Sequence, residues 1–422
     1  MAVIKAIRAR EILDSRGNPT IETTAWADNG AAAVASIPSG ASKGMFEALE
    51  LRDEDPARFK GRGVLKAVNN VNTFIAPKVI GMDPTYQTKI DKLMVDLDGT
   101  ENKGKLGANA ILSVSQAVCE LAAVVTRRAT FQYINEKYGL GVLNAANMPT
   151  PVFNLINGGK HGAGSNLDFQ EFQVIPSSSQ TFTQALMMGE VIYQNLKEAL
   201  IKRNASYSVG DEGGFSPSLF SNTDALELLV EAINVSNFVY GKEVFLGLDV
   251  ASDEFFKESK YVFKDKSQPL GTEEMIAFYV QLNKDYKLLY LEDGLMEDDF
   301  EGWTKLTAAI GGTTLVIGDD FLATNKKRLL QAITKKACNA VLVKPNQIGT
   351  ISETVEVIKI AKENNMDVIV SHRSGETNDD FIADLAVGVG APYVKFGAPA
   401  RGERVVKYNR LMAIDALLNA KR

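Results

Sequence analysis

The sequence predicts two domains, an N-terminal α+β domain over residues 1–138 and a (β/α)8-type barrel over residues 139–422. The first domain is indicated by strand patterns that give way to helical spacing, because strands followed by helices are typical of a compact α+β unit. The second is indicated by short apolar runs that alternate with amphipathic segments, the pattern of parallel strands joined by helices. A stretch rich in Gly, Asn and Pro, residues 138–151, marks the expected boundary.

The N-terminal region begins with strand signals and continues with helix signals. The alternating segment TIETTAWA leads through an Asp-Asn-Gly turn at residues 28–30 into AAAVASIP, which predicts antiparallel strands within residues 1–38. From residue 60 to residue 137 apolar residues recur at helical spacing. The longest apolar stretch, residues 106–125, is interrupted by Asn109, Ser113 and Glu120, so we expect a buried helix rather than a membrane span.

In the C-terminal region each apolar run ends in a polar or charged residue. The runs VFLGLD, KLLYLE, TLVIGD, AVLVK, DVIVSH and YVK end, in that order, at Asp249, Glu292, Asp319, Lys344, His372 and Lys395. Because the carboxyl ends of barrel strands open onto one mouth, where active sites lie, we expect these side chains to converge. After the fourth run, Thr350 and Glu353 predict a capping box at the start of a helix.

The composition narrows the class of protein. Hydrophobic residues make up 45% of the chain and charged residues 23%, which is ordinary for a globular protein, and the formal net charge is -6. This acidic balance argues against nucleic acid or an anionic membrane as the main partner, so an anionic substrate would need metal ions, Lys or Arg at its site. MAVIKAIRAR lacks the features of a signal peptide, and Cys119 and Cys338 fit buried thiols, so we expect a cytoplasmic protein.

Three acidic residues at successive strand ends, Asp249, Glu292 and Asp319, form the first candidate site. Carboxylates gathered in a barrel mouth repel one another unless a cation lies between them. An all-oxygen site without Cys or His favours a hard ion, Mg²⁺ before Mn²⁺ or Ca²⁺. The alternative is that each acid caps a helix or pairs with an arginine.

Two lysines at strand ends, Lys344 and Lys395, are the candidate basic groups. A lysine near metal ions and a second lysine has its charged form disfavoured, so we expect its pKa to fall, as a general base for a weak carbon acid requires. The alternative is a structural salt bridge to the acids. His372 is followed by Arg373 and Ser374, which offer a guanidinium fork and a hydroxyl to a phosphate.

Further candidates lie in glycine-rich loops. His161 lies in NGGKHGAGSN, and Glu212 stands beside paired glycines in SVGDEGGF, which let the backbone approach a ligand closely. Glu171 follows in LDFQEF. The segment PSGASKG resembles a mobile lid rather than a Walker loop, and its Ser42 could offer oxygen to a metal.

These segments together resemble the enolase family. The matching stretches, from residue 11 to residue 409, are EILDSRGNPT, PSGASKG, EALELRD, KLGANAILSVS, NLINGGKH, QEF, VGDEGGF, LDVAS, LEDGL, DDFEGW, GDDFLATN, VKPNQIG, SHRSGET and KFGAPARGERVVKYN. The resemblance implies an α+β lid domain before a TIM-like barrel, and a glycolytic, Mg²⁺-dependent lyase that interconverts 2-phosphoglycerate and phosphoenolpyruvate. It also implies a homodimer or an octamer.

The resemblance assigns roles to particular residues. It implies that Asp249, Glu292 and Asp319 hold a first Mg²⁺, and that a second Mg²⁺ arrives with the substrate and is held by its phosphate and by Ser42. It implies that Lys344 removes the C2 proton. The implied acid is Glu212, which protonates the departing C3 hydroxyl with support from Glu171. The implied substrate-binding residues are His161, Glu171, Glu292, Asp319, His372, Arg373, Ser374 and Lys395.

The sequence departs from the family pattern in a few places. Lys43 replaces a commoner Thr in the lid and is followed by Met45 and Phe46, the stretch from His161 to Glu171 is one residue longer, and Gly402 replaces a frequent Ser. Two other functions stay open. One is a different reaction on the same scaffold, such as racemisation or dehydration of an acid sugar. The other is plasminogen binding at a cell surface through the lysine-bearing stretch 255–265, whose simpler interpretation is a solvated loop.

Overall fold

The N-terminal region forms an antiparallel sheet backed by helices. The structure is a computed structural model that describes residues 2–40, 44–162 and 165–420. The sheet contains β1 (Ile4–Leu13), β2 (Pro19–Ala27) and β3 (Ala32–Ser36), in that order. Gly30 has a positive φ of 88° in the turn between β2 and β3, as the Asp-Asn-Gly signal predicts. The strands expected within residues 1–38 are confirmed.

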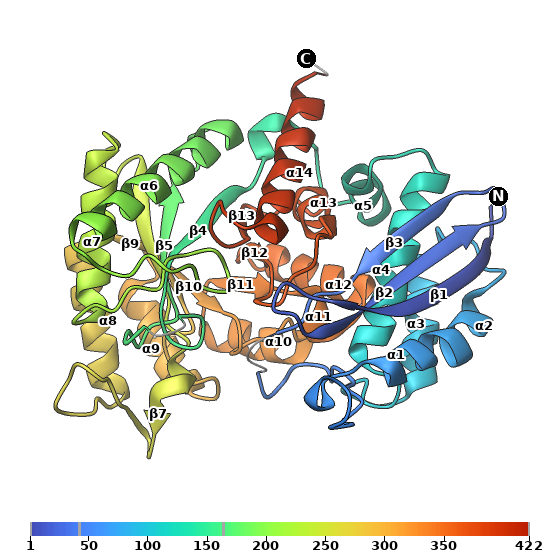
Figure 1. The fold of residues 1–422 in the computed structure, drawn as a ribbon, viewed down its shortest axis with the longest axis horizontal. Coiled ribbons are helices and arrows are strands. Elements are labelled where there is room, and N and C mark those ends of the chain that lie inside the picture. The colour runs from blue at the N-terminus through green and yellow to red at the C-terminus, as the bar shows by residue number, and fades with distance from the viewer. Residues whose placement is uncertain (1, 41–43, 163–164, 421–422) are drawn as a thin grey trace.

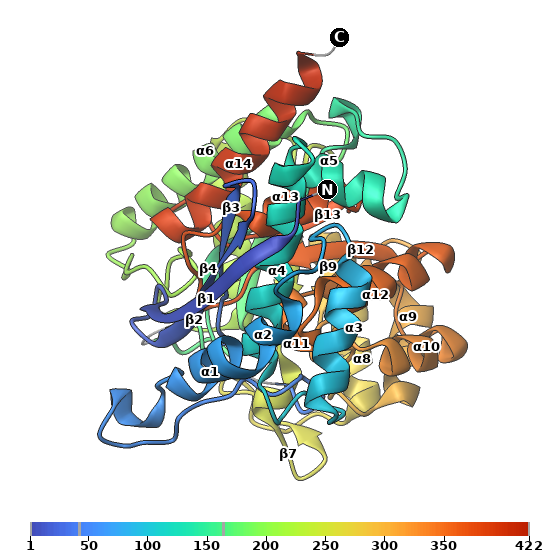
Figure 2. The same ribbon diagram turned by 90° about the vertical axis from the view of Figure 1, so that its right-hand side faces the viewer.

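Helices occupy the rest of this region, as the periodicity predicts. They are α1 (Leu65–Asn70), α2 (Ala76–Val79), α3 (Gln87–Asp98), α4 (Ala108–Val125) and α5 (Thr130–Tyr138), with a π-helical turn at Val71–Ile75 between α1 and α2. Helix α4 packs on β2 and β3 with one face and on α11 and α12 of the barrel with another (Figure 2). By length and composition alone α4 could cross a membrane, but 83% of its apolar window is buried inside the fold.

The second region is a barrel. Within the described residues its strands close in the order β4-β5-β6-β9-β10-β11-β12-β13, with β13 pairing back to β4 (Figure 1). The strands are β4 (Thr150–Asn157), β5 (Glu171–Pro176), β6 (Val244–Asp249), β9 (Leu288–Glu292), β10 (Leu315–Gly318), β11 (Ala340–Val343), β12 (Asp367–Ser371) and β13 (Tyr393–Lys395). The (β/α) barrel that the recurring apolar runs predict is confirmed.

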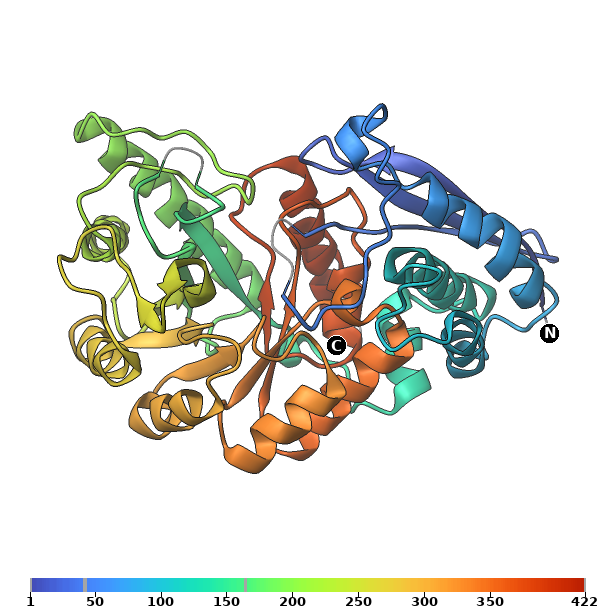
Figure 3. The same cartoon turned by 90° about the horizontal axis from the view of Figure 1, so that it is seen from below.

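The outer helices of the barrel alternate with its later strands, and Figure 3 shows them as a ring beside the N-terminal region. They are α6 (Phe182–Lys202), α7 (Asn222–Val235), α8 (Thr272–Tyr286), α9 (Phe300–Ile310), α10 (Lys326–Lys335), α11 (Pro345–Ile348), α12 (Ile351–Glu363), α13 (Phe381–Gly388) and α14 (Gly402–Asn419). Thr350 caps α12, because its hydroxyl oxygen accepts from the backbone N–H of Glu353 at 3.1 Å.

One strand departs from the expected parallel pattern. Strand β5 runs antiparallel to both of its neighbours, β4 and β6. The connection from β4 to β5 is a glycine-rich loop without a helix, and only parallel strands need a long crossover. The reversal places the beginning of β5, rather than its end, at the mouth where the other strands end. Glu171, the first residue of β5, is therefore level with Asp249, its partner at the end of β6.

The barrel interior is filled by apolar side chains below the mouth. This inner cluster contains Val152, Ile175, Tyr290, Ile317, Ala340, Leu342 and Ile369. A second, larger core lies between the strands and the helices. Cys119 and Cys338 are both buried free thiols, as expected. A short hairpin, β7 (Phe256–Lys257) and β8 (Lys260–Tyr261), projects beyond the barrel near β9 (Figure 1).

Candidate active site

The polar strand ends meet in one pocket at the barrel mouth. The residues that line it are His161, Gln170, Glu171, Glu212, Asp249, Ala251, Asp293, Asp319, Asp320, Lys344, Ser371, His372, Arg373, Ser374 and Lys395. They come from both ends of the barrel sequence and from the loops between strands. The expected convergence is therefore found. A larger groove between α3 and α12 contains none of these residues and lies apart from the polar mouth.

Lys395 lies at the centre of an acidic cluster. Its ammonium group donates to Asp249 and Glu292 at 2.8 Å each, and lies 3.2 Å from Glu171. Burial disfavours its charge, but these acids outweigh burial and raise the pKa of Lys395 well above its usual value. Burial and the charge of Asp249 raise the pKa of Glu292 well above its usual range. This cluster therefore stores negative charge in excess of its one lysine.

Lys344 lies on the next part of the mouth, paired with Asp319. The ion pair is short, and Gln347 also donates to Asp319, at 2.9 Å. Burial lowers the pKa of Lys344, but Asp319 outweighs burial and raises it above its usual value. The expectation of a lowered pKa is thus wrong for the protein groups alone. The reason is that the nearest charge is a carboxylate rather than a cation.

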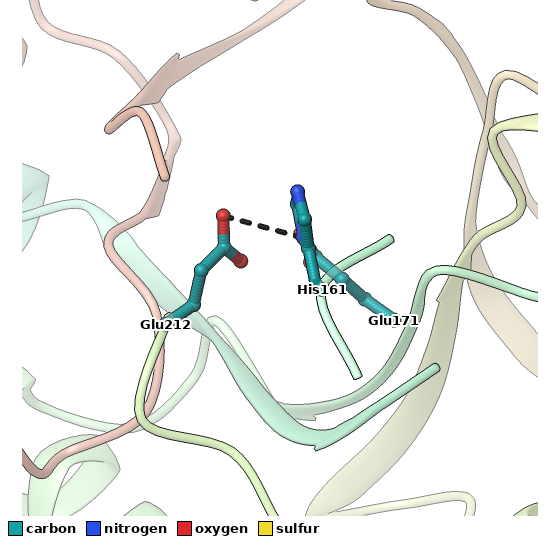
Figure 4. Close-up of side chains that lie close together, drawn as sticks. All are labelled: His161, Glu171 and Glu212. Carbon is teal, nitrogen blue, oxygen red and sulfur yellow. Dashed lines mark ion pairs between the residues drawn. The ribbon is translucent and has the colours of Figure 1, made fainter. Parts of the chain in front are cut away.

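The opposite part of the mouth joins one histidine to two glutamates, shown in Figure 4. Nδ1 of His161 lies 3.4 Å from Glu212 and 3.6 Å from Glu171. Burial disfavours the imidazolium, but the two carboxylates outweigh it and raise the pKa of His161 to about 10. Burial and the charge of Glu212 raise the pKa of Glu171 to about 7. The cluster therefore holds protons at neutral pH.

Glu212 is brought to this cluster by a tightly packed loop. Asn154 of β4 donates to Glu212 at 2.9 Å, and the hydroxyl of Ser374 donates at 3.1 Å. A Cβ on Gly214 would lie 2.2 Å from Asn157, so the paired glycines allow the close approach that the sequence predicts. The nearby His161 outweighs the effect of burial and holds the pKa of Glu212 well below its usual value.

The turn after β12 presents His372, Arg373 and Ser374 to the same pocket. It is held by the buried side chain of Arg404, which donates to Nδ1 of His372 at 2.7 Å and to the carbonyl of Arg373 at 2.6 Å. Burial lowers the pKa of His372 to about 4, which agrees with a ring nitrogen that accepts from an arginine. A neutral histidine, a guanidinium and a hydroxyl thus face one cavity.

Two family models match this chain. The model described as "Enolase, C-terminal TIM barrel domain" matches residues 145–422, and the model described as "Enolase, N-terminal domain" matches residues 4–134. The chain belongs to the enolase family. Membership indicates a lyase of the enolase superfamily that acts on a small molecule.

Enolase-family proteins use Mg²⁺, so we tested the acidic groups for a fit. Asp249 and Glu292 are adjacent in register at the ends of β6 and β9, and Asp319 follows β10. All three are buried, and their mutual repulsion raises the pKa of Glu292, so a hard cation suits them. Without one, Asp249 and Glu292 surround Lys395, whereas Asp319 pairs with Lys344. Ser42, the remaining predicted ligand, lies outside the described residues.

The tightest acidic groupings among the described residues differ from the predicted trio. One consists of Asp293, Asp319 and Asp320, and the other of His161 with its two glutamates. Asp293 was not predicted. Its carboxylate accepts from the backbone N–H groups of Asp319 and Asp320 at 2.9 and 2.8 Å, so it shapes the turn after β10. Its position directly after Glu292 was the available signal.

Sequence reasoning also missed supporting residues that come from distant segments. These are Asn154 beside Glu212, Gln347 beside Asp319, and Arg404 behind the turn after β12. Each lies within a stretch that resembles the family, but none ends a strand. Only a family alignment or the structure itself could single them out.

Proposed function

We propose that the protein catalyses the Mg²⁺-dependent, reversible dehydration of 2-phosphoglycerate to phosphoenolpyruvate, as a phosphopyruvate hydratase. The observation that carries this proposal is the separation of a base and an acid across one pocket. Lys344 follows β11, and Glu171 begins β5, which is four strands away in either direction around the closed sheet. Glu212 lies beside Glu171 and β4. A substrate between them meets a lysine on one side and a carboxyl group on the other.

This arrangement suits an elimination across two adjacent carbon atoms. Lys344, once unprotonated, takes the proton from C2, and the electron pair of that C–H bond forms the C2=C3 double bond. The C3–O bond breaks, and Glu212 gives its proton to the leaving hydroxyl so that water departs. Hydroxide alone is a poor leaving group, which explains why the acid is needed.

Proton supply to Glu212 follows from its neighbours. The low pKa of Glu212 leaves it ionised at rest, whereas His161, 3.4 Å away, holds a proton. We propose that His161 passes this proton to Glu212 as the C3–O bond weakens. Glu171, with a pKa of about 7, lies on the other side of the imidazole and can restore it.

The charges around the pocket support an anionic substrate. Arg373 and Ser374 would bind the phosphate, and Lys395 would face the carboxylate. Asp249, Glu292 and Asp319 would hold Mg²⁺, which neutralises the negative charge that develops on the substrate carboxylate. A cation beside Asp319 competes with Lys344 for that carboxylate. Loss of the ion pair lowers the pKa of Lys344 toward the range of a working base.

The first experiment follows the ultraviolet absorbance of the enol product formed from 2-phosphoglycerate, with and without Mg²⁺. We expect Mg²⁺-dependent product from the wild type, and a rate about 10²- to 10⁴-fold lower from Lys344→Ala. Lys335→Ala is the matched control, because Lys335 is an exposed lysine at the end of α10. It should keep the wild-type rate.

Absence of product from folded, Mg²⁺-loaded wild type would overturn the proposal. Acid sugars would then be assayed, since other reactions of the superfamily use the same acids and barrel. Plasminogen binding stays a separate prediction. Lys257 and Lys260 of the β7–β8 hairpin are exposed, but Phe255, Tyr261 and Phe263 around them are buried. The cytoplasmic location and the dimeric or octameric state are likewise expectations, tested by fractionation and by light scattering.

A further inference from the structure

Residues 44–49, the described part of the lid that follows the glycine-rich segment, fold back onto the rest of the molecule. The backbone N–H of Ala48 donates to the carbonyl of Gln347 at 2.8 Å, and that of Leu49 donates to Asn102 at 2.7 Å. The ring of Phe46 stacks under the guanidinium of Arg328, 3.7 Å from its centroid. The lid therefore contacts the barrel through α10 and α11, and the N-terminal region through the loop before α4.

Within this segment one charged side chain reaches the candidate active site. Glu47 accepts from both terminal nitrogens of Arg373, at 3.0 and 3.1 Å, in a two-bond fork. The side chains of Arg373 and Glu47 are only 5% and 8% exposed. The two residues are 326 positions apart in the sequence. Asn346 accepts a further bond from Arg373, at 2.9 Å.

The contacts on Arg373 divide into two sets. Its backbone is held by Glu376, which accepts from its N–H at 3.0 Å, and by Arg404. Its guanidinium is held by Glu47 and Asn346. The first set fixes where the residue lies, and the second set fixes the plane of the charged group. A planar donor fork recognises an oxyanion well only when its plane is fixed.

Docking of the lid alone does not require this buried charge. Phe46 and the two backbone hydrogen bonds already attach the segment, and an apolar side chain at position 47 would avoid the cost of removing a carboxylate from water. A buried ion pair adds direction rather than simple adhesion. Its direction here is toward a guanidinium that lines the pocket.

We propose that Glu47 is a positioning residue that orients the guanidinium of Arg373 for the phosphate of the substrate and links binding of that phosphate to docking of the lid. The identity of the anion rests on the proposed function. The orienting contact itself does not, because it depends only on the fork between Glu47 and Arg373. Since Arg373 contacts the phosphate both before and during the reaction, Glu47 acts on substrate affinity more than on the chemical step.

The test compares Glu47→Gln with wild type in steady-state kinetics on 2-phosphoglycerate. A glutamine keeps the shape but loses the charge, and the loss of a charge-assisted contact corresponds to a rise in KM of about ten- to hundredfold, with kcat changed much less. Glu47→Asp, which keeps the charge on a shorter stem, should recover part of the affinity. Glu54→Gln is the matched control, because Glu54 is an exposed acid in the same segment.

A second measurement separates this inference from the proposed reaction. Isothermal titration with inorganic phosphate measures anion binding without turnover. Weaker phosphate binding by Glu47→Gln than by Glu54→Gln and wild type supports the role of Glu47 even if 2-phosphoglycerate is not turned over, an outcome that sinks only the proposed function. Phosphate binding that is unchanged overturns the role of Glu47. If Glu47→Gln does not fold, Glu47→Asp carries both measurements with a smaller expected change.

Two kinetic outcomes also count against the role. A lower KM for Glu47→Gln would mean that Glu47 competes with the substrate for Arg373, which is the opposite of orientation. A lower kcat with unchanged KM would place Glu47 in the chemical step. Hydrogen exchange at Ala48 and Leu49 tests the link to the lid. Phosphate should slow exchange in wild type and have little effect in Glu47→Gln, and equal slowing in both proteins would overturn the link.

Discussion

The two sides of the barrel mouth treat their protons differently. On the side of β6, β9 and β11, both lysines are held in close ion pairs with carboxylates, and their pKa values are raised. On the side of β4 and β5, Nδ1 of His161 and Nε2 of His372 have no hydrogen-bond partner within the described residues. There the pKa of Glu171 is about 7. The first side holds charge in fixed positions, and the second side has groups that can exchange protons near neutral pH.

The difference teaches how one pocket can both bind an anion and move protons. Close ion pairs are rigid, and they suit the stabilisation of charge. Proton transfer needs groups whose pKa values lie near the working pH and whose contacts can shift. In this pocket the two requirements are met by separate walls, built on different strands. Mutations on the two walls should therefore have different signatures.

Glu212→Gln should break the comparison most strongly. Dehydration of 2-phosphoglycerate should fall by about 10²- to 10⁴-fold, because glutamine cannot give a proton to the leaving hydroxyl. Removal of the C2 proton by Lys344 should continue, so hydrogen at C2 should still exchange with deuterated water. Nuclear magnetic resonance of the substrate measures this exchange. Lys344→Ala is the control that loses both activities, and loss of exchange in Glu212→Gln would contradict the division of roles.

Lys395→Met tests the charge-holding wall through stability. The ammonium group is replaced by an apolar side chain of similar length, which leaves Asp249, Glu292 and Glu171 buried without their shared cation. The free energy of unfolding in urea should fall by about 3–5 kcal/mol at neutral pH in the absence of Mg²⁺. The loss should shrink in acid, where the carboxylates are protonated.

The control for that experiment is Lys305→Met. Lys305 pairs with Glu273 on the surface, where the two side chains are 57% and 70% exposed. Its replacement should cost less than about 1 kcal/mol. Equal costs for the two substitutions would show that the buried cluster has no special dependence on Lys395.

His161→Gln tests the proton-exchanging wall through the pH dependence of stability. The pKa of His161 rises from 6.5 to about 10 on folding. A raised pKa means that the folded protein binds the proton more tightly, so the stabilisation is complete below pH 6.5 and is lost as the pH rises through 10. The advantage of wild type over His161→Gln, measured by urea unfolding, should therefore decrease across this window. An advantage that grows with pH would contradict the sign.

The sequence predicts the parts of the site that follow a local rule. Asp249, Glu292 and Lys395 end buried strands, and the pattern of short apolar runs is enough to bring them to one mouth. Glu171 follows no such rule, because β5 is reversed and Glu171 begins its strand. Its assignment came only from the resemblance to the family. The direction of a strand depends on the loop before it, which carries no clear signal in one sequence.

Charges were harder to predict than positions. The pKa of Lys344 was expected to fall, but the ion pair with Asp319 raises it, and which neighbour dominates depends on distances that a sequence does not contain. The bond between Glu47 and Arg373 is a stronger case. It joins segments 326 positions apart, and no spacing or composition rule links them.

Helix α4 has a consequence for how the chain is made. It packs on β2 and β3 on one side and on α11 and α12 on another, so the partners of its second face lie more than two hundred positions further along the chain. During synthesis the N-terminal sheet can cover α4 early, while its barrel-facing side chains stay uncovered until α12 has left the ribosome. A ribosome that stalls in the barrel therefore displays an apolar helix face, a surface that chaperones bind.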